Sequence, residues 1–100
     1  DFRDAYATLK EKAIEFGDQR IYTSARAIMF ARRVCYMFVR PKKTYLELVF
    51  FLPERLDDLS VHKVEQETKT KYTHTFKLVH SDQVEEPLID WLKAAYDSSI

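Results

Sequence analysis

Basic and aromatic side chains alternate along one stretch of the chain that contains no acid. Between Gln19 and Leu46 the sequence holds seven basic residues and neither Asp nor Glu, although the net charge of the whole chain is zero. The aromatic rings among these cations include Tyr22, Phe30, Tyr36 and Tyr45. Cations pair with phosphates and rings stack on bases, so this pattern is typical of a surface that binds nucleic acid or another polyanion. The candidate contact residues are Arg26, Arg32, Arg33, Tyr36, Arg40, Lys42 and Lys43.

The charge distribution also fits a protein partner. From Ser81 onward five acidic residues accompany a single basic one, Lys93. We call the cation-rich stretch 20–43 the basic hairpin. The basic hairpin and the acidic C-terminal helix could therefore complement each other between two copies, or dock on a larger host chain. Phe50 and Phe51 are adjacent, so one of them lies on each face of its strand and a partner could cover one face. A structural role is open too, because Lys and Arg at a sheet edge discourage aggregation.

Residues that could perform catalysis or bind metal have simpler explanations. His74 and His80 lie six residues apart on one predicted strand, about 20 Å, so they cannot share an ion there. Two histidines without a placed cysteine or carboxylate, as His62 and His74 would be, are weak support for a metal site. The acidic groups are explained as a solvated connection (Glu54, Asp57 and Asp58) and as the first turn of a helix (Glu85 and Glu86). We expect no catalytic residue, no metal and no cofactor.

Length and composition indicate one folded domain over residues 1–100. The hydrophobic content of 46% predicts a packed core. No apolar run approaches the ~20 residues of a transmembrane helix, and the first residues show no signal-peptide pattern, so we expect no membrane partner. The single Cys35 cannot form an internal disulfide, which is typical of a reducing compartment and favours the cytoplasm.

The elements that must position these residues are organised around a central hairpin. Its apolar strands, Met29–Val39 and Tyr45–Leu52, are joined by an Arg-Pro-Lys-Lys turn in which Pro41 presets the backbone. Further strands are predicted near residues 21–25, 61–67 and 72–78. Helical periodicity predicts a helix over about residues 2–16 and another that begins near Glu85 or Glu86. The fold class is therefore α+β, with an antiparallel sheet of about five strands and both helices on one face, in the order α-β-β-β-β-β-α.

The pattern of side chains in the first hairpin strand is compatible with two arrangements of its faces. Residues 34–39 are apolar at both parities, so either both faces are covered or one is an aromatic platform that carries Phe30, Tyr36 and Phe38. Arg32 and Arg33 suggest a bulge, because both must reach water. The second strand is clearer, since alternation points Leu46, Leu48, Phe50 and Leu52 to the core.

Three parts of the sequence together resemble a known family. They are the basic hairpin with its Arg-Pro-Lys-Lys turn, the strand TYLELVFFL and the closing segment YTHTFKLVHSDQVEEPLIDWLKAAYD. They resemble a family of small bacterial domains catalogued as a domain of unknown function. The resemblance implies an α+β sandwich with a curved antiparallel sheet, found alone or appended to nuclease-like and other domains, and it implies no catalytic residues. Pro87 departs from the family pattern, where an ordinary helix former is expected.

These observations predict a non-enzymatic binding or accessory module with a protein-interaction or homodimerising surface. The alternative is polyanion or nucleic-acid binding through the basic hairpin 20–43, and the second alternative is a small-molecule-binding domain.

Overall fold

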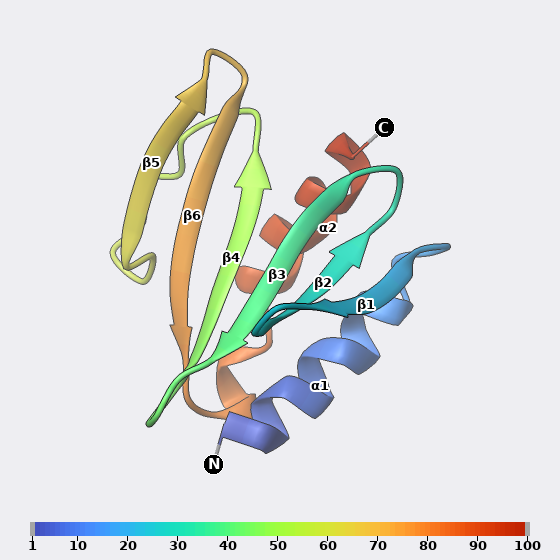
Figure 1. Ribbon diagram of the computed structural model, residues 1–100. Helices are drawn as coiled ribbons and strands as arrows, with labels where there is room; N and C mark the ends of the chain where they lie inside the picture. The colour runs from blue at the N-terminus through green and yellow to red at the C-terminus, as the bar shows by residue number, and fades with distance from the viewer. Residues whose placement is uncertain (1, 100) are drawn as a thin grey trace.

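The computed structural model describes residues 2–99, which form two α-helices and a six-stranded antiparallel sheet (Figure 1). In chain order the elements are α1 (Phe2–Ile14), β1 (Arg20–Ser24), β2 (Ala27–Ala31), β3 (Cys35–Pro41), β4 (Leu46–Leu52), β5 (Lys63–Thr68), β6 (Lys71–Leu78), a short 3-10 helix η1 (Ser81–Gln83) and α2 (Leu88–Ser98). The strands lie in the order β1-β2-β3-β4-β6-β5. The predicted α+β class is confirmed.

Both helices pack on one face of the sheet, which we call the covered face, and they share one core with it. The helices contribute Ala5, Leu9, Ala13, Leu88, Leu92 and Ala95, and β4 contributes Leu46, Leu48, Phe50 and Leu52. The predicted inward set of this strand is therefore confirmed. Full burial of a Leu or Phe side chain contributes about 1.5–3 kcal/mol, so this common core, more than helix propensity, holds the helices in place.

The central hairpin is formed by β3 and β4, as predicted. After Pro41 the Lys42 N–H donates to the Tyr45 carbonyl at 2.8 Å and closes the turn. The strand predicted over Met29–Val39 is, however, two strands, β2 and β3, so the sheet has six strands rather than five. A tight turn separates them, in which the Arg32 N–H donates to the Val34 carbonyl at 3.2 Å.

A bulge in β3 changes which side chains face the core. Phe30 pairs with Met37 and Ala31 with Cys35, so Tyr36 is the extra residue. A bulge of this kind turns two successive side chains to the same face. Tyr36 and Met37 are both buried accordingly. The predicted bulge exists, but it lies after the arginine pair rather than at it.

Helix α2 begins later than predicted. Its first residue is Leu88, and the Pro87 carbonyl accepts a hydrogen bond from the Trp91 N–H at 3.1 Å. Proline has no N–H to donate to a preceding turn, so it stands at the helix boundary instead of inside the first turn. Glu85 and Glu86 precede the helix. No helix within residues 2–99 has the length and apolar character needed to cross a membrane.

Candidate functional site

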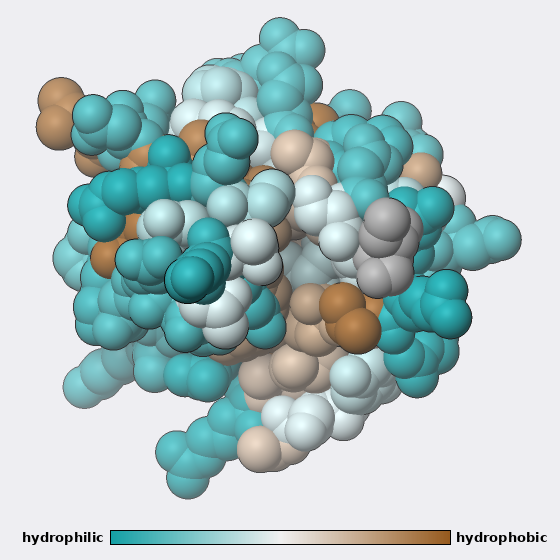
Figure 2. Space-filling view, turned by 90° about the horizontal axis from the view of Figure 1, so that it is seen from above, coloured by the Kyte–Doolittle hydropathy of each residue, from teal (hydrophilic) through white to brown (hydrophobic). Residues whose placement is uncertain are grey.

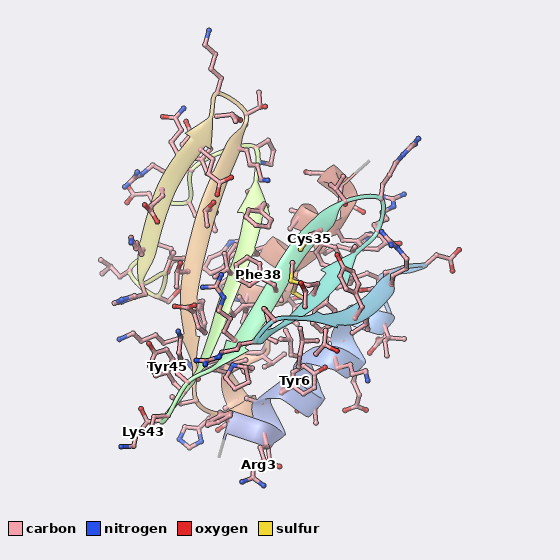
Figure 3. The ribbon with its side chains drawn as sticks, viewed as in Figure 1. Arg3, Tyr6, Cys35, Phe38, Lys43 and Tyr45 are labelled. Carbon is pink, nitrogen blue, oxygen red and sulfur yellow. The ribbon has the colours of Figure 1, made fainter. Side chains whose placement is uncertain are left out.

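The face of the sheet opposite the helices is the open face, and one row of side chains crosses all of it. Directly paired residues of neighbouring strands project to the same side of a sheet. The registers of the strand pairs therefore align Tyr22, Met29, Phe38, Val49, Thr75 and Lys63. Phe38, on the central strand β3, is labelled in Figure 3. The connection from β4 to β5 runs over the covered face, because the Leu56 N–H donates to the inward-facing His74 Nε2 at 3.0 Å.

Four aromatic rings on the open face each have a cation over them. With the distance from the cation to the ring centroid, the pairs are Arg40 over Phe38 (4.8 Å), Lys71 over Phe51 (4.4 Å), Lys77 over Tyr45 (5.1 Å) and Arg20 over Tyr22 (5.7 Å). The rings of Phe38 and Phe51 also contact each other, with centroids 6.0 Å apart. Each exposed pair contributes about 0.5–1 kcal/mol, so the rings orient the cations while their charge stays in water.

Two hollows on the open face meet at Phe38 and Arg40, and together we call them the open-face groove. One has a volume of about 430 Å³ and lies over β3 to β5, and the other has about 620 Å³ and lies between the β1–β2 turn and β3. The charged lining comprises five basic side chains (Arg26, Arg40, Lys42, Lys63 and Lys77) and two acidic ones (Glu47 and Glu65). The groove therefore carries a surplus of positive charge.

Both carboxylates of the groove are already paired. Arg40 Nη1 lies 3.6 Å from Glu47 Oε1, and Lys63 Nζ lies 3.3 Å from Glu65 Oε1. The Arg40 side chain is 48% exposed, and ion pairs in such surroundings contribute only about 0–1 kcal/mol. An anion that enters the groove can therefore draw the guanidinium away from Glu47 at little cost.

Three of the seven site residues predicted from the sequence meet in the groove. Arg26, from the β1–β2 turn, lines the same hollow as Arg40 and Lys42, at the end of β3. Met29 and Phe38 form the apolar part of that hollow. The structure thus brings together cations that are up to 16 positions apart in the sequence.

The other four predicted residues lie outside the groove. Arg32 places its guanidinium carbon 4.7 Å from the Tyr96 ring centroid and donates to the Tyr96 carbonyl at 3.4 Å. Arg33 is exposed in the β2–β3 turn, and Lys43 extends from the tip of the β3–β4 turn, away from the sheet (Figure 3). These three residues therefore contribute no contact to the groove.

The prediction that Tyr36 offers a stacking face was wrong. The bulge turns its ring into the core, where it is 1% exposed and meets the Tyr96 ring edge-on at 5.4 Å. Its hydroxyl donates to Gln19 Oε1. Burial raises the pKa of the Tyr36 phenol. Of the three rings of the predicted platform, only Phe38 lies on the open face, because Phe30 on β2 is buried as well.

The basic residues that β5 and β6 bring to the open face are not among the site residues predicted from the sequence. Lys63, Lys71 and Lys77 lie far from the acid-free stretch in sequence, but β6 pairs directly with β4. The alternation of apolar and polar residues over 71–78 predicts the placement of two of these lysines. Since His74 and Phe76 point to the core, Lys71 and Lys77 must point to the opposite face.

The family of the chain follows from its sequence. A family model described as a domain of unknown function (DUF5655) matches residues 1–99. The chain belongs to this family. The match confirms the resemblance carried by the hairpin, the central strand and the closing segment. Neither a curated protein nor a solved structure matches the chain.

The DUF5655 domain has a further cavity of about 420 Å³ at the end of the sheet where α2 ends. Figure 2, which looks onto the molecule from above, shows apolar side chains gathered around a hollow. The lining includes Val34, Leu52, Ala95 and the half-buried Cys35. The Cys35 thiol donates to the Met37 carbonyl at 3.2 Å, and burial raises its pKa. A thiol that is protonated at neutral pH is a poor nucleophile.

His74 of this DUF5655 domain is a core residue. It is 0% exposed and stacks on Phe50 with ring centroids 5.1 Å apart. Its Nε2 accepts from the Leu56 N–H, whereas no group among residues 2–99 bonds to Nδ1. Burial lowers the pKa of His74, and Arg55 acts in the same direction. Within residues 2–99 no three His, Cys, Asp or Glu side chains are grouped closely enough to hold a metal ion.

Proposed function

We propose that the open-face groove is the binding surface of a non-enzymatic module and that its ligand is a polyanion. The observation that carries this proposal is the meeting of Arg26, Arg40 and Lys42 around Phe38, in a groove with more basic than acidic side chains. Cations on such a surface attract phosphates, and their charge raises the rate of encounter with an anionic chain. The uncovered face leaves room for a long ligand to lie across several strands.

The position of the acidic residues favours a polyanion over a second copy of the chain. The exposed Glu85, Glu86 and Asp90 lie in or just before α2, which packs on the covered face. A contact between this acidic surface and the groove of another copy would join two different surfaces. Such heterologous contacts must close into a ring or grow into a filament. Binding of a polyanion requires no such closure. The rival hypothesis is a homodimer or another protein partner.

The setting of the module is part of the same proposal. The lone, protonated Cys35 suits a reducing compartment, which supports action in the cytoplasm. The family resemblance supports a bacterial accessory domain that accompanies larger proteins, nuclease-like ones among them. An anion-binding accessory domain would hold such a protein on its substrate without performing chemistry itself.

The test is a titration of the protein with labelled single-stranded and double-stranded oligonucleotides at several salt concentrations. We expect affinity to fall with salt. If three to five phosphates are contacted, the slope of log K against log salt should be about −2 to −3.5 for single strands and about −2.7 to −4.5 for duplexes. Parallel sedimentation runs should show a monomer over the concentrations used. Absence of binding at low salt, or dimerisation through the groove, would overturn the proposal.

Two matched double variants locate the surface. Arg26→Glu with Lys42→Glu reverses two charges in the groove, and Lys10→Glu with Lys12→Glu reverses two on α1, on the covered side. Both double variants change the net charge equally. Loss of binding in the first alone places the contact in the groove, whereas equal losses would show that only the overall charge matters.

A second candidate function, binding of a small apolar molecule, is favoured by the cavity at the end of α2. Its volume of about 420 Å³ lies within the range of ~300–1,000 Å³ typical of ligand sites. A fragment screen followed by NMR tests it, because binding should shift the resonances of Val34 and Ala95. Fragments that shift only residues of the open-face groove, which shares no lining residue with this cavity, would speak against the cavity as a site.

A further inference from the structure

We infer that the polyanion is a single-stranded nucleic acid whose bases stack on the rings of the open face. This inference rests on the proposed function and narrows it, because charge alone would attract duplexes, single strands and acidic polymers alike. It starts from the apolar side chains that lie between the cations on the open face, which we call the apolar floor. A phosphate backbone alone would make no favourable contact with them.

The floor lies at the centre of the open face. Phe38 and Phe51 contact each other there, and Val49, on the same strand as Phe51, is only 5% exposed although no helix covers it. Phe38 pairs in register with both Val49 and Met29, so apolar side chains continue across three strands. In a duplex the faces of the bases are hidden within the stack, whereas a single strand can turn them toward a protein. The floor therefore fits single strands.

The cations that cover two of the rings must move aside before a base can stack there. Arg40 lies over Phe38 and Lys71 over Phe51, at 4.8 and 4.4 Å from the ring centroids. Such contacts are weak at exposed sites, so a base can displace the cation from the ring, and the displaced cation can then pair with the phosphate next to that base. Arginine can also stack its planar guanidinium on a base, so Arg40 can extend the platform when it swings off the ring.

The row across the open face gives the strand a path. Six strands at ~4.8 Å spacing make the row about 24 Å wide, enough for a strand of about four nucleotides or more. Basic side chains stand at both ends of this path, Arg26 and Lys42 near β1 and Lys63 and Lys77 toward β5. Rings and methylene groups make no hydrogen bonds to the base-pairing edges of the bases. Binding should therefore depend little on base sequence.

The test compares ligands of equal charge and variants of equal size. Oligothymidines of about four to twelve nucleotides, matched duplexes and a heparin fragment are titrated at one salt concentration. Phe38→Leu removes the ring of the open face and keeps an apolar side chain, and Phe16→Leu is its control. Phe16 is also half-buried with one ring partner, Tyr96, but it lies on the covered side. NMR of the Phe38 ring protons provides a direct signature of stacking.

We expect single strands to bind at least about tenfold more tightly than duplexes, and Phe38→Leu to remove about that factor. Phe16→Leu should leave the affinity unchanged, and only single strands should shift the Phe38 ring protons. If duplexes and heparin bind equally well and Phe38→Leu has no effect, stacking is wrong while polyanion binding stands. If no anion binds, both proposals fail. If Phe38→Leu unfolds the protein, absence of ring shifts in the wild type overturns the inference.

Discussion

Phe38 and Arg40 lie two residues apart on β3, and the guanidinium carbon of Arg40 sits 4.8 Å from the centroid of the Phe38 ring. Side chains two positions apart on a strand share a face, which is why this pair can form. The same two residues line both hollows of the groove. One pair thus joins the apolar floor to the basic rim, and substitutions there can separate stacking from charge.

Arg40→Gln should weaken polyanion binding without unfolding the protein. The side chain is 48% exposed, and its partners are a half-buried ring and a half-buried carboxylate. We expect the free energy of unfolding, measured with urea, to change by less than about 1 kcal/mol. The slope of log K against log salt should fall by about one phosphate contact. A loss of stability above about 2 kcal/mol would instead make Arg40 a structural residue.

The order and type of the elements could be predicted because their periodicities are strong. Strand alternation over residues 46–52 and 71–78 and helical spacing in α1 and α2 persist through each element. The sixth strand was missed because residues 29–39 are apolar at both parities, and the turn at Arg32 contains neither Gly nor Pro. Nothing in the local sequence distinguishes that turn from a strand.

The candidate site could be predicted only in part. The acid-free stretch identified Arg26, Arg40 and Lys42, which do meet in the groove. The prediction placed Tyr36 on the wrong face of the sheet because a single bulged residue moves a side chain to the other face. Strict alternation along a strand does not predict where a bulge occurs. The lysines of β5 and β6 were missed because the strand order, which places β6 next to β4, is a property of the tertiary structure.

Gly17→Ala should destabilise the protein strongly. The backbone φ of Gly17 is +140°, where side chains other than glycine are strained, and an added Cβ would lie 2.5 Å from Tyr96 Oη. That hydroxyl donates to the Asp18 carbonyl at 2.9 Å, so it cannot move away freely. We expect a loss of about 2 kcal/mol or more in thermal or urea unfolding.

The double variant with Tyr96→Phe tests the contact with the hydroxyl. Without that hydroxyl the added Cβ at position 17 has a less severe steric clash. The loss of unfolding free energy in the double variant should therefore be smaller than the sum of the losses in the two single variants. Strictly additive losses would mean that backbone strain at Gly17 alone is responsible.

Ser99→Ala should detach the end of α2 from the β2–β3 turn. Ser99 Oγ donates to the Val34 carbonyl at 2.6 Å and accepts from the Val34 N–H at 3.2 Å, in a buried position. Removing the hydroxyl leaves the Val34 N–H without its acceptor and the Val34 carbonyl with the Arg32 N–H alone, which should cost about 1–3 kcal/mol. Ser98→Ala is the control, because exposed Ser98 bonds only within its own helix and should change stability by less than about 0.5 kcal/mol. Equal effects of the two changes would contradict this role of Ser99.

Stability should fall on mild acidification because of His74. Burial lowers its pKa below the ordinary value of 6.5, so the folded state favours the neutral ring, whose Nε2 can accept from the Leu56 N–H. The unfolded chain takes up the proton first. The contribution of His74 is therefore fully present above about pH 6.5 and is lost as the pH falls through that value toward the lower pKa of the folded state. Protonation also removes the acceptor that holds the connection between β4 and β5.

Urea unfolding between about pH 5.5 and 7.5 measures this dependence, in the window set by the ordinary histidine pKa. His74→Gln keeps a side-chain acceptor but cannot titrate, so its free energy of unfolding should change less with pH than that of the wild type. His62→Gln, at an exposed position, should preserve the wild-type slope. Hydrogen exchange at the Leu56 amide supplies an independent check, because exchange there should accelerate beyond the ordinary pH trend as His74 becomes protonated. If the wild type and His74→Gln show the same slope, the imidazole does not control the acid stability of the fold.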